Sequence, residues 1–123
     1  MNDAAPQKRA FSTPPGVRLG PLSLIAPDAA RNFVVQVGDA LFHGFVVHKD
    51  GAVRGYVDRC PHTGLPLAQD PGAYLTPQAD LIACAWHGAL FRIADGLCIG
   101  GPCAGRGLTP WPVRVADGFI VTD

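Results

Sequence analysis

Two short stretches of the chain each place a cysteine, a histidine and a glycine close together. They read C-P-H-T-G over residues 60–64 and C-A-W-H-G over residues 84–88, and we call them the first and second knuckle. At these spacings the Cys and His side chains leave a tight loop side by side, and the glycine lets the backbone fold close beneath a bound metal. The four candidate ligands are Cys60, His62, Cys84 and His87.

The way these ligands are shared between the knuckles bears on which metal they bind. A set of two Cys and two His can hold tetrahedral zinc, but zinc fingers place both cysteines in one half and both histidines in the other. Here each knuckle supplies one of each. This distribution favours a [2Fe-2S] cluster, in which one iron takes both cysteines and the other takes both histidines. Structural zinc and ordinary packing of these residues remain the alternatives.

The pattern C-x-H-x-G followed by C-x-x-H-G resembles that of the Rieske family, which all four candidate ligands match position by position. The 21 residues between His62 and Cys84 are more than the resemblance leads us to expect. The excess falls in the Pro- and Gly-rich residues 70–78, which we interpret as a longer surface loop. The resemblance implies that Cys60 and Cys84 bind a buried iron and that His62 and His87 bind the iron nearer the surface, which is the one reduced.

Composition narrows the class of protein. A chain of 123 residues forms one domain by the usual size range, and its ten basic and ten acidic residues give no basic excess for nucleic acid or anionic lipid. The sequence has no Glu but 15 Gly and 12 Pro, so it is rich in residues that break helices. An all-β fold is therefore expected.

The sequence predicts a protein without a membrane anchor. Residues 1–10 lack the apolar core of a secretory signal, and no run approaches the length of a membrane span. We therefore expect a cytoplasmic location and no membrane partner. Within the resemblance, this places the chain with the soluble ferredoxins rather than with the anchored Rieske proteins of respiratory complexes.

Alternating and β-branched segments predict the strands. They cover residues 33–37, 41–47, 53–57, 81–83, 89–93, 97–99, 108–115 and 119–121. Turns at Asp-Gly pairs join several of them into hairpins, so each knuckle follows the end of a strand.

The same pattern predicts the domain organisation. Residues 1–20 are expected to form a flexible tail, and residues 21–123 a single domain. Strands on both sides of the knuckles suggest an antiparallel base with residues 58–93 inserted as a cluster-binding subdomain. The Rieske resemblance implies that arrangement, a β-sandwich or barrel with an inserted subdomain.

The remaining histidines and tryptophans have simpler interpretations. His43 and His48 have no cysteine or carboxylate at ligand spacing, so we interpret them as structural or surface residues. Trp111, between two prolines, is expected to pack in the core. Trp86 lies between the ligands of the second knuckle, where shielding of the cluster and ordinary packing are equally compatible with the sequence.

Two further cysteines lie beyond the knuckles. Cys98 and Cys103 are separated by four residues, and a cytoplasmic location disfavours a stable disulfide between them. Respiratory Rieske proteins tie their two loops by a disulfide, but this chain has Leu65 and Ala85 at the matching positions. We therefore expect two free thiols, with a redox-sensing pair or an extra metal site as the alternative.

The favoured function is that of a Rieske-type ferredoxin. The resemblance implies a one-electron carrier that accepts from a flavin-dependent reductase and donates to a terminal oxygenase or reductase. Alternatives are the small subunit of a nitrite reductase and a regulatory module that senses redox state. An enzyme is disfavoured. Once the knuckles have taken two of the histidines as ligands, only His43 and His48 remain to build a second iron site.

The residues after the second knuckle bear on the reduction potential. High-potential Rieske proteins have a serine directly after the knuckle glycine and a tyrosine two residues later, and both hydroxyls donate hydrogen bonds at the cluster. This chain has Ala89 and Phe91 there. The resemblance therefore implies a potential near the low end of the family range.

Overall fold

The structure is a computed structural model that describes residues 8–61, 67, 74–84, 88–101 and 105–123. Within these ranges it contains ten β-strands, one short 3-10 helix, η1 (Leu22–Leu24), and no α-helix. The all-β prediction is thus confirmed. No helix in the described ranges is long and apolar enough to cross a membrane.

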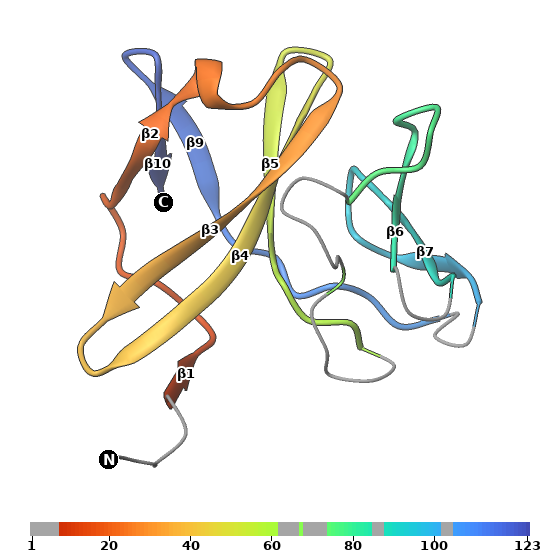
Figure 1. The fold of residues 1–123 in the computed structure, drawn as a ribbon, viewed down its shortest axis with the longest axis horizontal. Coiled ribbons are helices and arrows are strands. Elements are labelled where there is room, and N and C mark those ends of the chain that lie inside the picture. The colour runs from red at the N-terminus through yellow and green to blue at the C-terminus, as the bar shows by residue number, and fades with distance from the viewer. Residues whose placement is uncertain (1–7, 62–66, 68–73, 85–87, 102–104) are drawn as a thin grey trace, which may run out of the picture.

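The strands form three sheets (Figure 1). The first contains β1 (Lys8–Ala10), β3 (Ala29–Val37), β4 (Ala40–Lys49) and β5 (Ala52–Val57); the second contains β2 (Arg18–Pro21), β9 (Val113–Ala116) and β10 (Phe119–Thr122); the third contains β6 (Leu81–Ala83), β7 (Leu90–Arg92) and β8 (Cys98–Gly100). Neighbouring strands pair antiparallel, except that β1 runs parallel to β4. The third sheet stands to one side of the other two.

The hairpin of β4 and β5 lies between two hydrophobic cores. Because successive side chains of a strand point to opposite faces, alternate residues of these strands serve different cores. One core, which we call the site core, includes Phe45, Val47 and Tyr56 of the hairpin. The other, which we call the base core, includes Phe42, Val46, Val53 and Val57. The site core also collects residues of the third sheet, so one hairpin joins the base to the predicted cluster-binding region.

Trp111 organises the base core, as the sequence predicts. It is 2% exposed, and its ring centroid lies 4.6 Å from that of Phe42. The indole Nε1–H donates to Thr13 Oγ1 at 2.9 Å, which satisfies the buried polar atom. The tryptophan therefore fastens the chain preceding β2 to the base.

Gly55 in β5 allows the backbone of Trp111 to approach closely. The Trp111 N–H donates to Gly55 O at 2.8 Å, and a Cβ added at Gly55 would lie 2.4 Å from Trp111 O. Overpacking against backbone typically costs about 1–3 kcal/mol, so Gly55→Ala should lower the melting temperature by at least about 4 °C. Circular dichroism at a fixed heating rate measures this. Gly100→Ala is the matched control, because its new Cβ would meet nothing closer than 3.8 Å; equal melting temperatures for both variants would contradict the close approach.

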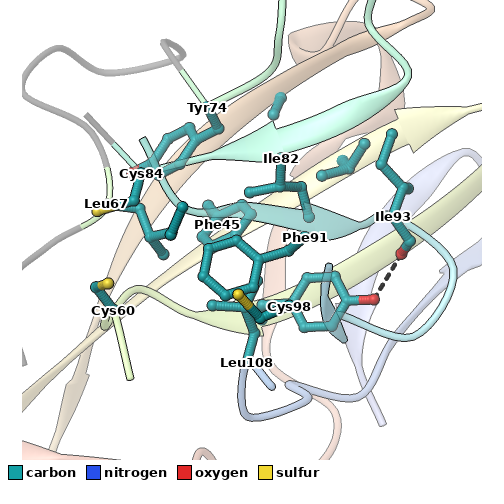
Figure 2. Packing of buried hydrophobic residues seen from close by; sticks show 14 residues of the cluster. Phe45, Cys60, Leu67, Tyr74, Ile82, Cys84, Phe91, Ile93, Cys98 and Leu108 are labelled. Carbon is teal, nitrogen blue, oxygen red and sulfur yellow. Dashed lines mark hydrogen bonds between the residues drawn. The ribbon is translucent and has the colours of Figure 1, made fainter. Parts of the chain in front are cut away.

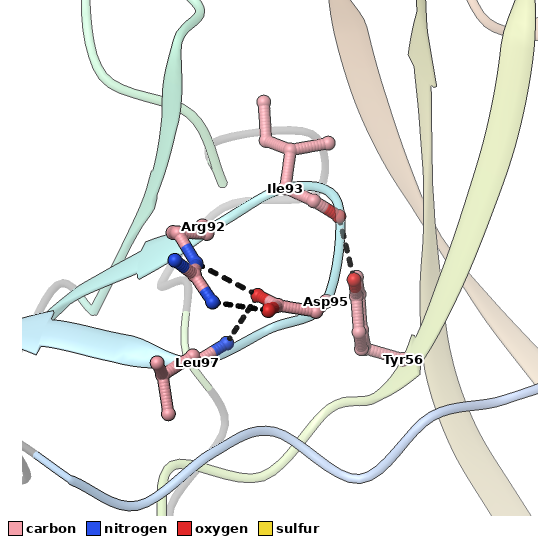
Figure 3. A network of polar contacts seen from close by, with 5 residues as sticks. All are labelled: Tyr56, Arg92, Ile93, Asp95 and Leu97. Atoms are coloured by element: carbon pink, nitrogen blue, oxygen red, sulfur yellow. Dashed lines mark hydrogen bonds and ion pairs between the residues drawn. The ribbon is translucent and has the colours of Figure 1, made fainter.

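A tyrosine hydroxyl ties the third sheet to the hairpin. Tyr56 donates to Ile93 O at 2.5 Å across the site core (Figure 3). Burial raises the pKa of Tyr56 to about 12, so the hydroxyl keeps the donated proton at neutral pH. The adjoining turn is closed by the Arg92 guanidinium and the Leu97 N–H, which both donate to the Asp95 carboxylate.

Two features of the domain organisation differ from the sequence-based expectation. The segment predicted as a flexible tail contains β1 and β2, so from Lys8 onward it belongs to the first two sheets; residues 1–7 lie outside the described residues. The strand predicted at residues 97–99 appears as β8, but it pairs with β7 in the third sheet rather than with the base. The sheet that carries the second knuckle therefore extends to Gly100, beyond the expected limit at residue 93.

Candidate metal centre

The structure describes half of the predicted ligand set. Cys60 and Cys84 lie within the described residues, whereas His62 and His87 lie outside them. Among the described residues, no group of three or more Cys, His, Asp or Glu side chains gathers as a metal site. The proposed ligand arrangement is therefore compared with the two cysteines and with the backbone around them.

The second knuckle is closed at its neck by the backbone. Cys84 directly follows β6, and its N–H donates to Ala89 O at 2.8 Å. The Gly88 N–H donates to Cys84 O at 3.1 Å, and Gly88 has a φ of 70°, a left-handed conformation that glycine adopts without strain. These bonds fix where the knuckle leaves and re-enters the third sheet.

The first knuckle follows the end of β5, which is anchored on both sides. The Val57 N–H donates to Thr109 O and the Asp58 N–H donates to His43 O, each at 2.9 Å. Cys60 comes two residues later. The cysteine therefore leaves a strand end whose position is set by β4 and by the chain that precedes β9.

Both thiols are buried in the site core. Cys60 is 0% and Cys84 2% exposed, and Figure 2 shows them with Leu67 at one side of the core. Two buried cysteine sulfurs on separate loops are the kind of donors that iron-sulfur clusters take. The described residues thus fit the cysteine half of a [2Fe-2S] site.

Asp58 fastens the loop between the knuckles. The residue is 7% exposed, and its carboxylate accepts hydrogen bonds from the Leu67 N–H and the Tyr74 hydroxyl, each at 2.9 Å. The pKa of Tyr74 lies above its ordinary value, chiefly because the ring is buried and further because of the Asp58 charge. Tyr74 also stacks on Phe45, with centroids 4.3 Å apart. One carboxylate thus joins the base of the first knuckle to two points of the following loop.

Removing this carboxylate should loosen the site. Asp58→Ala leaves a buried backbone N–H and a buried hydroxyl without an acceptor, which should cost about 2–4 kcal/mol and accelerate cluster loss. The rate at which visible absorption decays in the presence of an iron chelator measures the effect. Asp80→Ala is the matched control, because it removes an exposed carboxylate that accepts from Thr76 at 2.6 Å. Equal decay rates in the two variants would mean that Asp58 does not support the knuckle.

Cys98 is a buried thiol on β8, where it pairs with Phe91 of β7. It is 2% exposed, donates to Gly100 O at 3.2 Å and forms no disulfide with another described residue. This agrees with the expectation of a free thiol. Cys103, its proposed partner in a sensing pair, lies outside the described residues, as does Trp86.

The two other histidines have structural surroundings, as predicted. His48 Nδ1 lies 3.0 Å from Ile25 O, within hydrogen-bonding distance. The pKa of His43 lies below its ordinary value, mainly because of burial and also because of the nearby Arg9 charge; Asp58 opposes this shift. The backbone carbonyl of His43 accepts the hydrogen bond from the Asp58 N–H.

Sequence reasoning missed the contribution of Asp58 and Tyr74. A signal was present, because Asp58 directly follows an apolar strand and stands two residues before Cys60, where a charged residue would be buried. The partner was not detectable, since Tyr74 lies 16 residues further along and meets Asp58 only in the folded chain.

Comparisons with known proteins agree with this geometry. A model of the Rieske [2Fe-2S] domain family matches residues 25–116, a range that includes both knuckles. No curated protein matches the chain.

Several solved structures have the same fold. The ferredoxin of carbazole 1,9a-dioxygenase from Nocardioides aromaticivorans IC177 has a TM-score of 0.68 and 19% identity, over 89% of this chain and 97% of that chain. The Sphingomonas yanoikuyae B1 ferredoxin has a TM-score of 0.66 and 23% identity, over 88% and 97%. A chain from a complex of reduced oxygenase and oxidised ferredoxin in carbazole 1,9a-dioxygenase has a TM-score of 0.68 and 23% identity, over 86% and 90%. At these identities the likeness shows the fold.

Proposed function

The chain belongs to the Rieske [2Fe-2S] domain family, and from this premise we propose that it is a Rieske-type ferredoxin, a one-electron carrier rather than an enzyme. The family's cofactor is a [2Fe-2S] cluster. The observation that supports a carrier is the pair of buried cysteines, Cys60 and Cys84, at the ends of anchored strands in a fold shared with ferredoxins.

The proposed ligands are Cys60, His62, Cys84 and His87. The two cysteines hold one iron from inside the site core, and the two histidines hold the other. The bound cluster supplies reversible uptake of one electron. Because neutral imidazoles place less negative charge on an iron than thiolates do, His62 and His87 would make their iron the easier one to reduce, and the electron would enter and leave on their side.

The chain's own residues shape and shield this site. Leu67 and Tyr74 are 0% and 2% exposed and pack with both cysteines in the site core, so they keep water away from the sulfur side. Asp58 keeps the two residues in place through its hydrogen bonds. A fixed, dry surrounding lets the site gain and lose an electron with little rearrangement, as a carrier requires.

The proposed partners are a flavin-dependent reductase as donor and a terminal oxygenase as acceptor. Support for the acceptor comes from the similar chain in a complex of oxygenase and ferredoxin. A nitrite reductase in place of the oxygenase would use the same carrier chemistry. The cytoplasmic location expected from the sequence stays a prediction, which a fluorescent fusion in the native host checks.

A sensing function is less well supported. A redox-sensing thiol needs access to oxidants, whereas Cys98 is 2% exposed and its thiol donates to a backbone carbonyl. The described half of the proposed sensing pair therefore has the surroundings of a packing residue.

An anaerobic titration tests the carrier proposal. Dithionite should bleach the visible absorption with one electron per chain, and the reduced protein should be reoxidised by an acceptor enzyme isolated by affinity capture from the native host. Substrate turnover by the chain alone, without that enzyme, would contradict the proposal. So would reduction that is not reversible.

A further inference from the structure

An exposed aromatic ring stands beside the first knuckle, between two arginines. Phe11 is 50% exposed, and the guanidinium carbons of Arg9 and Arg59 lie 5.6 and 5.5 Å from its ring centroid. Both distances are within the range of cation–π attraction. Arg59 directly precedes Cys60, so the Phe11 ring lies against the residue just before the first knuckle begins.

The segment that carries Phe11 is fixed on both sides. Before it, β1 pairs with β4, with Arg9 opposite Leu41. After it, Thr13 accepts a hydrogen bond from Trp111, and Pro14 O accepts one from Thr122 Oγ1 at 2.8 Å. An exposed large apolar side chain fixed in this way adds no core burial, yet it presents a rigid anchor to another molecule.

A third arginine, in the loop that precedes β9, also contacts the first knuckle. Arg106 Nη1 donates to Pro61 O at 3.4 Å, next to Cys60. Arg59, Pro61 and Thr109 line a cavity of about 240 Å³ that adjoins Cys60. We define the basic patch as Arg9, Phe11, Arg59 and Arg106, all exposed.

The cations of the basic patch form no ion pair with an acid among the described residues, although the buried Asp58 directly precedes Arg59. Within the described part of the chain, Arg9, Arg59 and Arg106 form no ion pair; the same holds for Arg18, Arg31 and Arg54, while Lys8, Lys49, Arg92 and Arg114 each form one. The β4–β5 turn is mixed in charge, because the cavity beside it is lined by Asp50 and Asp80 but also by Lys49, Arg54 and Arg92. That turn is separated from Cys60 by the length of β5, about 20 Å at roughly 3.3 Å per residue. The three unpaired guanidinium groups therefore give the described surface beside the first knuckle a local positive charge.

We propose that the basic patch is the docking surface for an acidic face of the oxygenase, with Phe11 as its apolar anchor. This inference rests on the proposed function, because it names the chemistry of the partner. Carboxylates on the partner would pair with the three guanidinium groups, and the aromatic ring would enter the centre of the contact. Docking there brings the acceptor to the first knuckle, whose sequence includes His62, a proposed ligand of the iron that exchanges the electron.

The net charge and the local charge make opposite predictions for small redox reagents. The oxidised cluster with its two thiolates is neutral, so reduction gives the whole protein one excess negative charge. Hexacyanoferrate(III) would then be repelled by the net charge but attracted by the basic patch. We expect stopped-flow oxidation of the reduced protein by this anion to slow by about tenfold as salt rises from low to physiological strength. Oxidation by cationic tris(phenanthroline)cobalt(III) should not slow.

Variants connect this salt dependence to the patch. Arg59→Gln and Arg106→Gln should each flatten the salt dependence at unchanged cluster absorption. Arg18→Gln is the matched control: Arg18 also stacks on an aromatic ring, Phe119 at 4.5 Å, but it lies on β2, away from the end of β5 (Figure 1). A rate with the anion that rises with salt, or equal slopes in Arg18→Gln and Arg59→Gln, would overturn the proposal.

A redox-inert probe separates this inference from the carrier function. Hexacyanochromate(III) should broaden the NMR signals of Phe11 and of the Arg59 and Arg106 side chains in the oxidised protein. Phe11→Leu should leave anion binding intact but weaken binding to the affinity-captured oxygenase by about tenfold or more, because an aromatic anchor at the centre of an interface carries a large share of the binding energy. Broadening elsewhere, or unchanged affinity in Phe11→Leu, would refute the docking surface. A protein that cannot be reduced would refute the carrier function alone.

Discussion

Cys60→Ser and His87→Ala are each expected to abolish the visible absorption of the cluster. Each change removes one of two protein ligands from an iron, and a site whose loops fold around a metal loses both together. The apoprotein should also become sensitive to proteases between residues 60 and 92, because the knuckles then lack their common centre. Iron content, absorption spectra and limited proteolysis of each purified variant measure this.

Cys98→Ser is the matched control for these variants. Cys98 is as buried as Cys84 and belongs to the same core, and serine keeps a donor for Gly100 O. Its iron content should stay near that of the unchanged protein, as should that of the double variant with Cys103→Ser. A normal spectrum in Cys60→Ser or His87→Ala would show that the residue is no ligand, and loss of iron in Cys98→Ser would revive the sensing alternative.

The reduction potential should lie near −150 mV, the low end of the Rieske range. Ala89 and Phe91 cannot donate the hydrogen bonds that serine and tyrosine supply in high-potential relatives. Ala89 faces Cys84 across the neck of the second knuckle, since the Cys84 N–H donates to Ala89 O at 2.8 Å. The missing hydroxyl therefore belongs beside a proposed ligand. The exposed guanidinium groups of the basic patch act in the opposite direction, but solvent and salt screen them.

Restoring a hydroxyl should raise the potential. A hydrogen bond to a charged acceptor contributes roughly 1.5–3 kcal/mol, of which only the strengthening on reduction, about 1–2 kcal/mol, shifts the couple. This corresponds to roughly 40–90 mV for Ala89→Ser, and Phe91→Tyr should act in the same direction.

Protein-film voltammetry measures both the unchanged protein and these variants. Ala94→Ser, at an exposed position in the β7–β8 turn, is the control and should leave the potential unchanged. A midpoint above about +100 mV for the unchanged protein would show that other donors outweigh the missing hydroxyls.

The sequence predicted the strands that carry the knuckles because local signals suffice for them. The apolar run before Cys84 gives β6 over Leu81–Ala83 as predicted, and the Asp-Gly turn before β5 places the end of that strand close to Cys60. The strand predicted at residues 108–115 begins later than expected, because β9 starts only at Val113. Pro110 and Pro112 lack the N–H groups that a continuous ladder needs, which explains the difference.

Pairing between distant segments was not predictable in the same way. Residues 8–21 have no clear period, yet they form β1 and β2 because β4 and β10 offer free edges to them. The basic patch has the same origin, since Phe11 and Arg59 are 48 positions apart in the sequence and meet only after β1 has paired. Spacing predicted the ligand types, whereas tertiary contacts determine what surrounds them.

Metal analysis of protein purified without air from its native host tests the central claim most directly. Two irons and two acid-labile sulfides per chain, with a red-brown colour, are the predicted result, because each knuckle offers one cysteine and one histidine. One zinc per chain with neither iron nor sulfide would contradict it.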